Sequence, residues 1–212
     1  MVCSACLMRL PFAEQVGCCR LCGRSVPGFE GEFVCGDCET HRPAFDRAAS
    51  ALRYEGEART IIKNYKFNNR VWLREDLADW LEAAARARLP VTAVDAVLPM
   101  PLSAWHRLDR GYNQSALLAA SLARRLDRAF LPNALRRIGN PKRQSELPAA
   151  ERYRNAAGTF AVSTPTSVRG RTILLVDDIM TTGATLSTAA AALKDASAAK
   201  IFCITLARSL QL

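Results

Sequence analysis

Short, unbroken apolar runs near the end of the chain alternate with a segment of helical character. Residues 172–176 (TILLV) and 200–206 (KIFCITL) are apolar runs of strand length, and the Ala-rich segment 185–196 between them favours a helix. Strands that are apolar at successive positions are buried on both faces, which is typical of parallel sheets. The pattern therefore predicts a β-α-β unit with a right-handed crossover.

Earlier segments extend this pattern toward the start of the chain. Strands are predicted over 46–54 and 94–100, and helices over 57–67, 72–88 and 113–128. Asn113 stands where a helix N-cap belongs. Residues 138–148 contain a glycine, two prolines and several polar side chains, so we expect a mobile loop there. The expected fold class is α/β, with a parallel sheet flanked by helices.

Cysteines are concentrated at the start of the chain. Seven of the eight lie within the first 38 residues, and six of these form three Cys-x2-Cys pairs: Cys3/Cys6, Cys19/Cys22 and Cys35/Cys38. The first residues do not form a signal peptide, so we expect a reducing compartment, in which clustered pairs indicate metal thiolates rather than disulfides. Two such pairs complete one closed tetrahedral zinc site.

The four cysteines nearest the rest of the chain are the preferred ligands of a structural zinc ion: Cys19, Cys22, Cys35 and Cys38. Cys3 and Cys6 could instead replace the Cys19 pair, or form a second site with Cys18 or His41. We therefore expect a cysteine-rich zinc ribbon over residues 1–42, followed by an α/β domain over residues 43–212.

Composition excludes several classes of protein. With 50% hydrophobic and 23% charged residues, the chain matches folded globular proteins rather than disordered ones. Its apolar stretches are far shorter than the roughly 20 residues that a membrane-spanning helix needs. We therefore expect no membrane insertion and a cytoplasmic location.

Positive charge is distributed unevenly along the chain. The formal net charge is +9, and residues 101–160 contain eleven Lys and Arg residues against four acidic ones. Such a concentration predicts attraction to phosphates or nucleic acid. The alternative interpretation is a set of solvated helix faces in a chain that uses Arg far more often than Lys.

The segment ILLVDDIMTTGATL, residues 173–186, is the most specific motif. Asp177 and Asp178 follow an apolar strand, and a hydroxyl-rich turn over residues 181–185 leads into a helix. Backbone N–H groups at such a turn and helix N-terminus bind phosphate well. Carboxylates beside a phosphate would repel it unless they face sugar hydroxyls or a magnesium ion. A ribose 5-phosphate meets both demands.

This motif resembles the phosphoribosyl-pyrophosphate loop of type I phosphoribosyltransferases, and it matches that pattern at every position. The sequence DRGYNQ, residues 109–114, is similar to a signature of the ComF/GntX family of competence-associated phosphoribosyltransferase-like proteins. The cysteine-rich start resembles the zinc ribbon of that family. Other positions that fit the family pattern are Tyr65, Lys66, Phe67, Gln144, Leu147, Arg152, Asn155 and Phe160. Longer members carry four Cys pairs, so the number of zinc ions is left open.

The resemblance implies a role for each part of the site. Asp177 and Asp178 would hold the 2- and 3-hydroxyls of the ribose. The 5-phosphate would bind to Thr181, Thr182, Gly183, Ala184 and Thr185. The loop that contains Met100 and Pro101 takes the place of the pyrophosphate loop, unless it is an ordinary Pro-bounded turn. Basic residues expected near the pyrophosphate are Arg107, Arg110, Lys142 and Arg143.

The resemblance implies a protein that binds phosphoribosyl pyrophosphate with magnesium. Its role would be the handling of single-stranded DNA during DNA uptake in natural competence, beside other competence proteins. The alternative is an active phosphoribosyltransferase of nucleobase salvage; the acceptor and the existence of turnover are left open. We expect any acceptor pocket within residues 45–90, where Tyr54, Tyr65, Phe67 and Trp72 are pocket or core residues.

Overall fold

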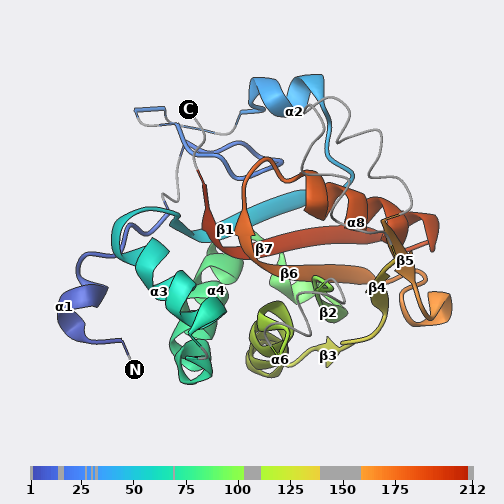
Figure 1. The fold of residues 1–212 in the computed structure, drawn as a ribbon. Coiled ribbons are helices and arrows are strands. Elements are labelled where there is room, and N and C mark those ends of the chain that lie inside the picture. The colour runs from blue at the N-terminus through green and yellow to red at the C-terminus, as the bar shows by residue number, and fades with distance from the viewer. Residues whose placement is uncertain are drawn as a thin grey trace.

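The computed structural model describes residues 2–13, 17–26, 28, 29, 31, 33–68, 70–102, 111–138 and 159–209. Its centre is a parallel five-stranded sheet in the order β1-β7-β6-β2-β3 (Figure 1). The strands are β1 (Arg47–Arg53), β2 (Ala96–Pro99), β3 (Ala129–Phe130), β6 (Thr172–Met180) and β7 (Lys200–Arg208). A small antiparallel pair, β4 (Leu135–Arg137) with β5 (Phe160–Val162), lies beside the sheet.

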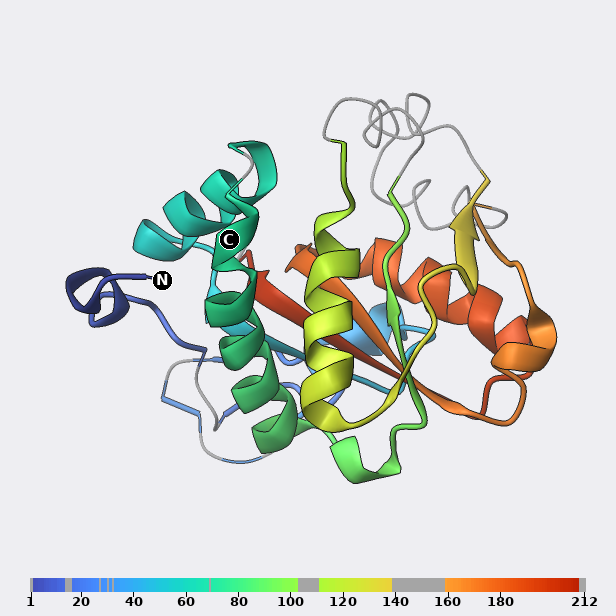
Figure 2. The ribbon, with the colours of Figure 1, turned by 90° about the horizontal axis from the view of Figure 1, so that it is seen from below.

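Helices cover both faces of the sheet. Figure 1 shows α8 (Ala184–Asp195) and the short α2 (Gly36–Thr40) on one face. Seen from below in Figure 2, α4 (Arg74–Arg88) and α6 (Gln114–Leu126) cross the other face, with α3 (Gly56–Phe67) beside α4. The predicted α/β fold with a parallel sheet flanked by helices is confirmed.

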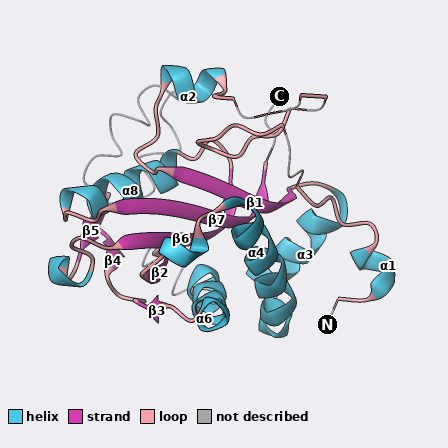
Figure 3. Ribbon diagram, turned by 180° about the vertical axis from the view of Figure 1, so that it is seen from behind, coloured by secondary structure: helices cyan, strands magenta, loops and turns pink. Residues whose placement is uncertain are grey.

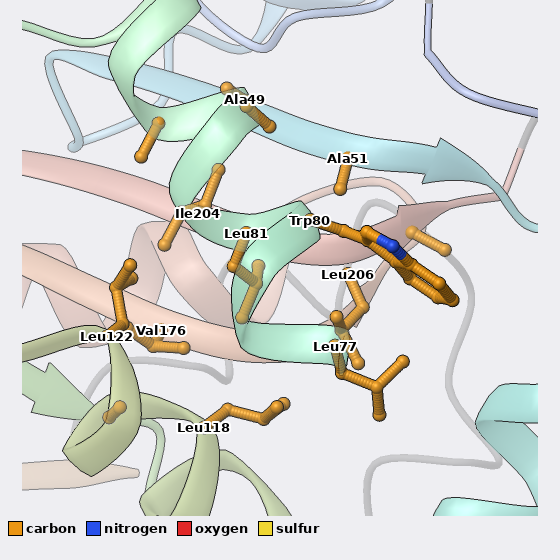
Figure 4. Packing of buried hydrophobic residues seen from close by; sticks show 14 of the residues in the cluster. Ala49, Ala51, Leu77, Trp80, Leu81, Leu118, Leu122, Val176, Ile204 and Leu206 are labelled. Atoms are coloured by element: carbon orange, nitrogen blue, oxygen red, sulfur yellow. The ribbon is translucent and has the colours of Figure 1, made fainter. Parts of the chain in front are cut away.

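The two-sided burial of the sheet explains its apolar strands. On β7, Phe202, Ile204 and Leu206 belong to the core against α4 and α6, whereas Ile201 and Cys203 belong to the core against α8. Figure 4 shows the first of these cores, in which Leu77 and Leu81 of α4 and Leu118 and Leu122 of α6 pack toward the sheet. Burial of one such side chain is worth roughly 1.5–3 kcal/mol, so both layers of helices stabilise the sheet.

Element positions follow the sequence pattern closely, with one difference that matters for the site. Asn113 caps α6 as predicted, since its side chain accepts a hydrogen bond from the Ala116 amide. The apolar run 172–176, however, is only the first part of β6, which continues through Asp177 and Asp178 to Met180. Both carboxylates therefore lie within the strand and not beyond its end.

Part of the N-terminal segment lies beside β1, the strand at one edge of the sheet, where Phe12 forms an isolated bridge with Leu52. The one-turn helix α1 (Ser4–Leu7) lies near α3 in Figure 3. Isolated bridges join Cys18 to Ser25 and Cys19 to Phe33. The Ala48 amide donates to the Leu21 carbonyl at 2.7 Å. None of the helices in the described ranges is long and apolar enough to cross a membrane.

Three 3-10 turns complete the described elements: Val71–Leu73 before α4, Val91–Ala93 before β2 and Pro165–Ser167 before β6. The first of these replaces the beginning of the helix predicted over 72–88, because the regular helix starts at Arg74. None of the three contributes a side chain to the site.

Candidate functional site

Two adjacent carboxylates lie near the carboxyl end of β6. Asp178 is only 8% exposed, and Asp177 is partly buried. The Oδ1 atom of Asp177 accepts hydrogen bonds from the Ser115 hydroxyl and from the Asp178 amide, both at 2.9 Å. Burial and the neighbouring Asp178 charge together raise the pKa of Asp177 to about 7. A carboxylate in such a position is prepared to receive a cation or a hydroxyl donor.

The second carboxylate forms an ion pair with a residue from another layer of the fold. Lys66, in the last turn of α3, places its Nζ 2.7 Å from Asp178 Oδ2. Both side chains are largely shielded from water, so each charge compensates for the loss of hydration of the other. Lys66 fits a segment of the family pattern, but it is not among the site residues predicted from the sequence. The signal that could have identified Lys66 is its position directly after Tyr65, an aromatic residue that is buried in the core.

Residues 181–183 connect β6 to α8, and Ala184 and Thr185 are the first residues of that helix; residues 181–185 are here called the 181–185 turn. Gly183 has φ +83° and occupies the N-cap position, a left-handed conformation that favours glycine. A Cβ at Gly183 would lie 2.5 Å from Met180 Cε. The Thr182 hydroxyl accepts a hydrogen bond from the Ala184 amide at 3.3 Å. The turn thus leads into the N-terminus of α8, and the first amides of such a helix are a suitable environment for an anion.

A second loop follows β2, the neighbour of β6. The Met100 amide donates to the Val176 carbonyl at 2.8 Å, and the Met100 carbonyl accepts from Asn113 Nδ2 at 3.0 Å. Gln114 Nε2 in turn donates to the Lys66 carbonyl at 3.0 Å. The loop that contains Met100 and Pro101 therefore lies at the same edge of the sheet as the carboxylates, fixed to the start of α6. The Asn-Gln pair does more than cap the helix.

Four basic residues assigned to the pyrophosphate lie outside the described residues: Arg107, Arg110, Lys142 and Arg143. Within the described part of the chain, Arg137 on β4 is a cation that the sequence analysis did not assign. Burial lowers the pKa of its guanidinium, and the negative charge of Asp177 opposes that shift. The Arg137 guanidinium lies 5.6 Å from the centre of the Phe160 ring. Arg137 is thus a further cation whose charge acts on the site.

The basic segment 101–160 is partly neutralised within the fold. Arg124 and Arg125 on α6 form ion pairs with Glu75 of α4, and Arg125 also pairs with Asp79. These two arginines join neighbouring helices on one face of the sheet. Of the two interpretations given above, the one as helix faces therefore fits Arg124 and Arg125, whose charges are already paired, better than the one as an anion-binding surface.

Four thiols of the N-terminal segment converge. The Sγ atoms of Cys19, Cys22, Cys35 and Cys38, here called the cysteine cluster, all lie within 4.8 Å of one another, and all four residues are buried. Cys22 Sγ lies 3.6 Å from Cys35 Sγ, close to the roughly 3.8 Å separation expected around a tetrahedral zinc ion with Zn–S bonds of about 2.3 Å. The cluster can therefore hold a metal ion, and its all-sulfur donor set suits zinc.

Cys3, Cys6 and Cys18 lie outside this cluster. Cys3 is exposed on the N-terminal arm, whereas Cys18 is buried and its Sγ accepts a hydrogen bond from Arg88 Nη1 at 3.1 Å. Among the described residues, the cysteine cluster is the one group of three or more potential ligands close enough to share a metal. Within the part of the chain that the structure describes, Cys3, Cys6, Cys18 and His41 therefore do not form the alternative second site.

Aromatic residues of the predicted acceptor region divide into core and surface. Tyr65 is fully buried, and its hydroxyl donates to the Gln114 carbonyl at 3.1 Å. Phe67 and Trp72, by contrast, are 60% and 52% exposed. Phe67 directly follows Lys66, so an exposed aromatic side chain stands next to the residue that contacts Asp178.

Part of the chain matches a known family of domains. Residues 113–211 match the family model described as "Phosphoribosyl transferase domain". Among solved structures, an adenine phosphoribosyltransferase has a TM-score of 0.42 at 18% identity, covering 66% of this chain and 74% of that chain. For a glutamine phosphoribosylpyrophosphate amidotransferase from B. subtilis the TM-score is 0.46 at 17% identity, covering 68% of this chain and 30% of that chain. This chain therefore spans less than a third of the amidotransferase.

Curated relatives match over most of their length. Competence protein F of Haemophilus influenzae is 30% identical over 194 residues, covering 88% of this chain and 81% of that protein. The DNA utilization protein YhgH of Salmonella typhimurium is 29% identical over 208 residues, covering 96% and 89%. Competence protein ComFC of Bacillus subtilis is 29% identical over 198 residues, covering 90% and 78%. The chain belongs to the ComF family of competence-associated proteins with a phosphoribosyltransferase domain.

Proposed function

We propose that the protein binds phosphoribosyl pyrophosphate together with magnesium at the carboxyl edge of β6 and β2. The observation that carries this proposal is the position of Asp177 and Asp178 near the end of β6, a few residues before a glycine turn that leads into the N-terminus of α8. The turn offers donors for a 5-phosphate, and the carboxylates offer acceptors for the ribose 2- and 3-hydroxyls. The phosphoribosyltransferase family match supports this assignment.

Each part of the edge has a role in this proposal. Thr181, Thr182, Gly183, Ala184 and Thr185 hold the 5-phosphate. The loop with Met100 and Pro101 takes the pyrophosphate, where Arg107, Arg110, Lys142 and Arg143 supply positive charge. Magnesium, an oxygen-seeking ion, would neutralise the pyrophosphate when bound. When the ligand binds, Asp178 exchanges its ion pair with Lys66 for a hydrogen bond from a sugar hydroxyl. The Lys66 ammonium then offsets part of the negative charge of the pyrophosphate.

The biological role that we propose is the handling of single-stranded DNA during uptake in natural competence, in the cytoplasm and beside other competence proteins. The names of the relatives, competence protein F and DNA utilization protein, support this role. Exposed Phe67 and Trp72 offer surfaces on which bases can stack. In this proposal, residues 1–42 form a zinc ribbon held by the cysteine cluster, and residues 43–212 form the phosphoribosyltransferase-type domain.

Calorimetric titration of magnesium phosphoribosyl pyrophosphate tests the binding proposal. We expect micromolar affinity for the wild-type protein and its loss in the double variant Asp177→Asn with Asp178→Asn. Asp195→Asn, an exposed aspartate at the end of α8, is the matched control and keeps the affinity. Equal binding by the double variant and the wild type would place the ligand elsewhere and overturn the proposal.

A second candidate is an active phosphoribosyltransferase of nucleobase salvage. The observation that favours it is the exposed aromatic side chain of Phe67, which directly follows Lys66 in the sequence, since a base can stack on an exposed aromatic ring. Release of pyrophosphate on addition of a free base would support this candidate. Binding of single strands that weakens steeply with salt would support the DNA-handling role. The two assays thus separate the candidates.

A further inference from the structure

A buried arginine links the cysteine cluster to the 181–185 turn. Arg208, the last residue of β7, is only 5% exposed. Its Nη1 donates to the Cys22 carbonyl at 2.5 Å and lies 3.4 Å from Met180 Sδ. None of the ion pairs found among the described residues involves Arg208, and its Nε has no hydrogen-bond partner there. Burial of an unpaired guanidinium is costly, so its position calls for an explanation.

The side of Arg208 that faces Met180 supports the turn. Met180 ends β6, and its Cε lies 2.5 Å from the place where a Cβ on Gly183 would stand. The same position is 3.7 Å from the ring of Phe45. Met180 and Phe45 therefore form the floor under Gly183, and Arg208 fixes the sulfur end of Met180. A shift of Arg208 would pass directly to the glycine of the turn.

Arg208 also contacts the cysteine cluster, through the Cys22 carbonyl. Residues of both regions line one small pocket, among them Cys22, Asp37, Cys38, Thr182, Gly183 and Arg208. A second contact joins the regions nearby, since the Ala44 amide donates to the Ser187 hydroxyl in the first turn of α8 at 2.9 Å. The cluster and the turn are therefore direct neighbours, with Arg208 between them.

The charges of these groups explain why a cation lies between the cysteine cluster and the turn. Four thiolates around one zinc ion carry a formal charge of −2, which would repel a phosphate bound at the adjacent turn. The guanidinium of Arg208 stands between the two and offsets part of that charge. It also transmits the position of the Cys22 knuckle to Met180.

We propose that Arg208 is a positioning residue through which the metal-loaded cysteine cluster holds the 181–185 turn in its phosphate-binding form. Loss of zinc then weakens binding of the 5-phosphate although zinc does not contact the ligand. The pyrophosphate loop is fixed by contacts other than Arg208, since the Met100 carbonyl accepts from Asn113 and the Met100 amide donates to Val176. This inference rests on the proposed function of the turn.

Calorimetry with two separate probes tests the link. Arg208→Met keeps the apolar stem but removes the guanidinium, and it should weaken binding of ribose 5-phosphate about tenfold while binding of inorganic pyrophosphate with magnesium stays within twofold. Arg169→Met, at an exposed arginine before β6, is the matched control. Zinc content and thermal unfolding show whether each variant is folded and metal-loaded. If Arg208→Met does not fold, Met180→Leu interrupts the same link and replaces it.

Removal of zinc from the wild type by a chelator gives the second arm. It should weaken ribose 5-phosphate binding by a similar factor, with little additional loss in Arg208→Met, because both changes interrupt one link. Unchanged ribose 5-phosphate affinity in a folded, zinc-loaded Arg208→Met variant overturns the inference. Equal losses for both probes also overturn it, since they indicate general damage. Absence of binding by the wild type would instead refute the proposed function.

Discussion

Lys66 Nζ and Asp178 Oδ2 lie 2.7 Å apart and join the last turn of α3 to the carboxyl end of β6. The pair brings a cation from one layer of the fold to a carboxylate in the central sheet. Tyr65 strengthens the same connection, because its carbonyl accepts a hydrogen bond from the Tyr112 hydroxyl at 2.6 Å, just before α6. The end of α3 is thus fixed over the sheet by contacts with two other elements.

Substitution of Lys66 by Met should destabilise the protein by about 1–3 kcal/mol, because it leaves the mostly buried Asp178 carboxylate without its partner. Urea unfolding at pH 7 measures the difference. Lys63→Met, on the exposed face of the same helix, is the matched control and should change stability by less than about 0.5 kcal/mol. Equal stabilities of Lys66→Met and Lys63→Met would show that the ion pair contributes nothing to the fold.

The raised pKa of Asp177 predicts a pH dependence of stability. In the folded protein Asp177 keeps its proton up to about pH 7, whereas in the unfolded chain it loses the proton near its ordinary value of 3.8. Between these values the folded state binds more protons, so the contribution of Asp177 to stability is lost as the pH rises. Asn cannot ionise, and Asp177→Asn should therefore gain stability relative to the wild type between pH 4 and 7.

The total gain should not exceed about 4 kcal/mol, since a change of one in pKa corresponds to about 1.4 kcal/mol. Urea unfolding of both proteins at several pH values measures it. Asp195→Asn, whose side chain is exposed, should show no such trend. A stability difference between Asp177→Asn and the wild type that does not vary with pH would contradict the raised pKa.

Local features of the site could be predicted from the sequence, because they depend on neighbouring residues. The two acids and the glycine turn are contiguous, and a left-handed Gly183 follows from the need to turn from a strand into a helix. The end of β6 could not be read from the apolar run. Its backbone pairing with β7 continues past Val176, with Asp177 opposite Thr205 and Ile179 opposite Ala207, and that pairing does not require apolar side chains.

Long-range features of the site could not be predicted, because they depend on the order of the strands. Lys66, Ser115 and Arg208 come from α3, α6 and β7, and each approaches the end of β6 only in the folded sheet. Each is a single polar residue within or beside an apolar segment, a weak pattern in the sequence. The ion pairs of Arg125 with α4 could not be predicted for the same reason, because the charge counted along the chain does not show which helices become neighbours.

Zinc content should separate the cysteine cluster from the N-terminal arm. Cys22→Ser removes one of four converging thiols and should abolish tight zinc binding, with the segment around the cysteine cluster destabilised by several kcal/mol. The double variant Cys3→Ser with Cys6→Ser is the matched control and should retain one zinc ion per chain. Metal analysis of the purified proteins measures both. Loss of zinc in the double variant would assign Cys3 and Cys6 to the metal site after all.

Gly183 should be the most sensitive glycine of the site. Substitution by Ala imposes a left-handed conformation on a residue with a Cβ and pushes that atom toward Met180 Cε, so we expect a loss of about 1–2 kcal/mol. Because the Met180 side chain can move but the backbone angle cannot, most of this cost is backbone strain.

The same substitution should weaken ribose 5-phosphate binding, since any relaxation of the strain turns the amides of the turn away from the ligand. Gly36→Ala, at a position with an ordinary φ and open space around it, is the control and should leave stability and binding unchanged. Binding at the wild-type level in Gly183→Ala would mean that the phosphate does not depend on the geometry of this turn.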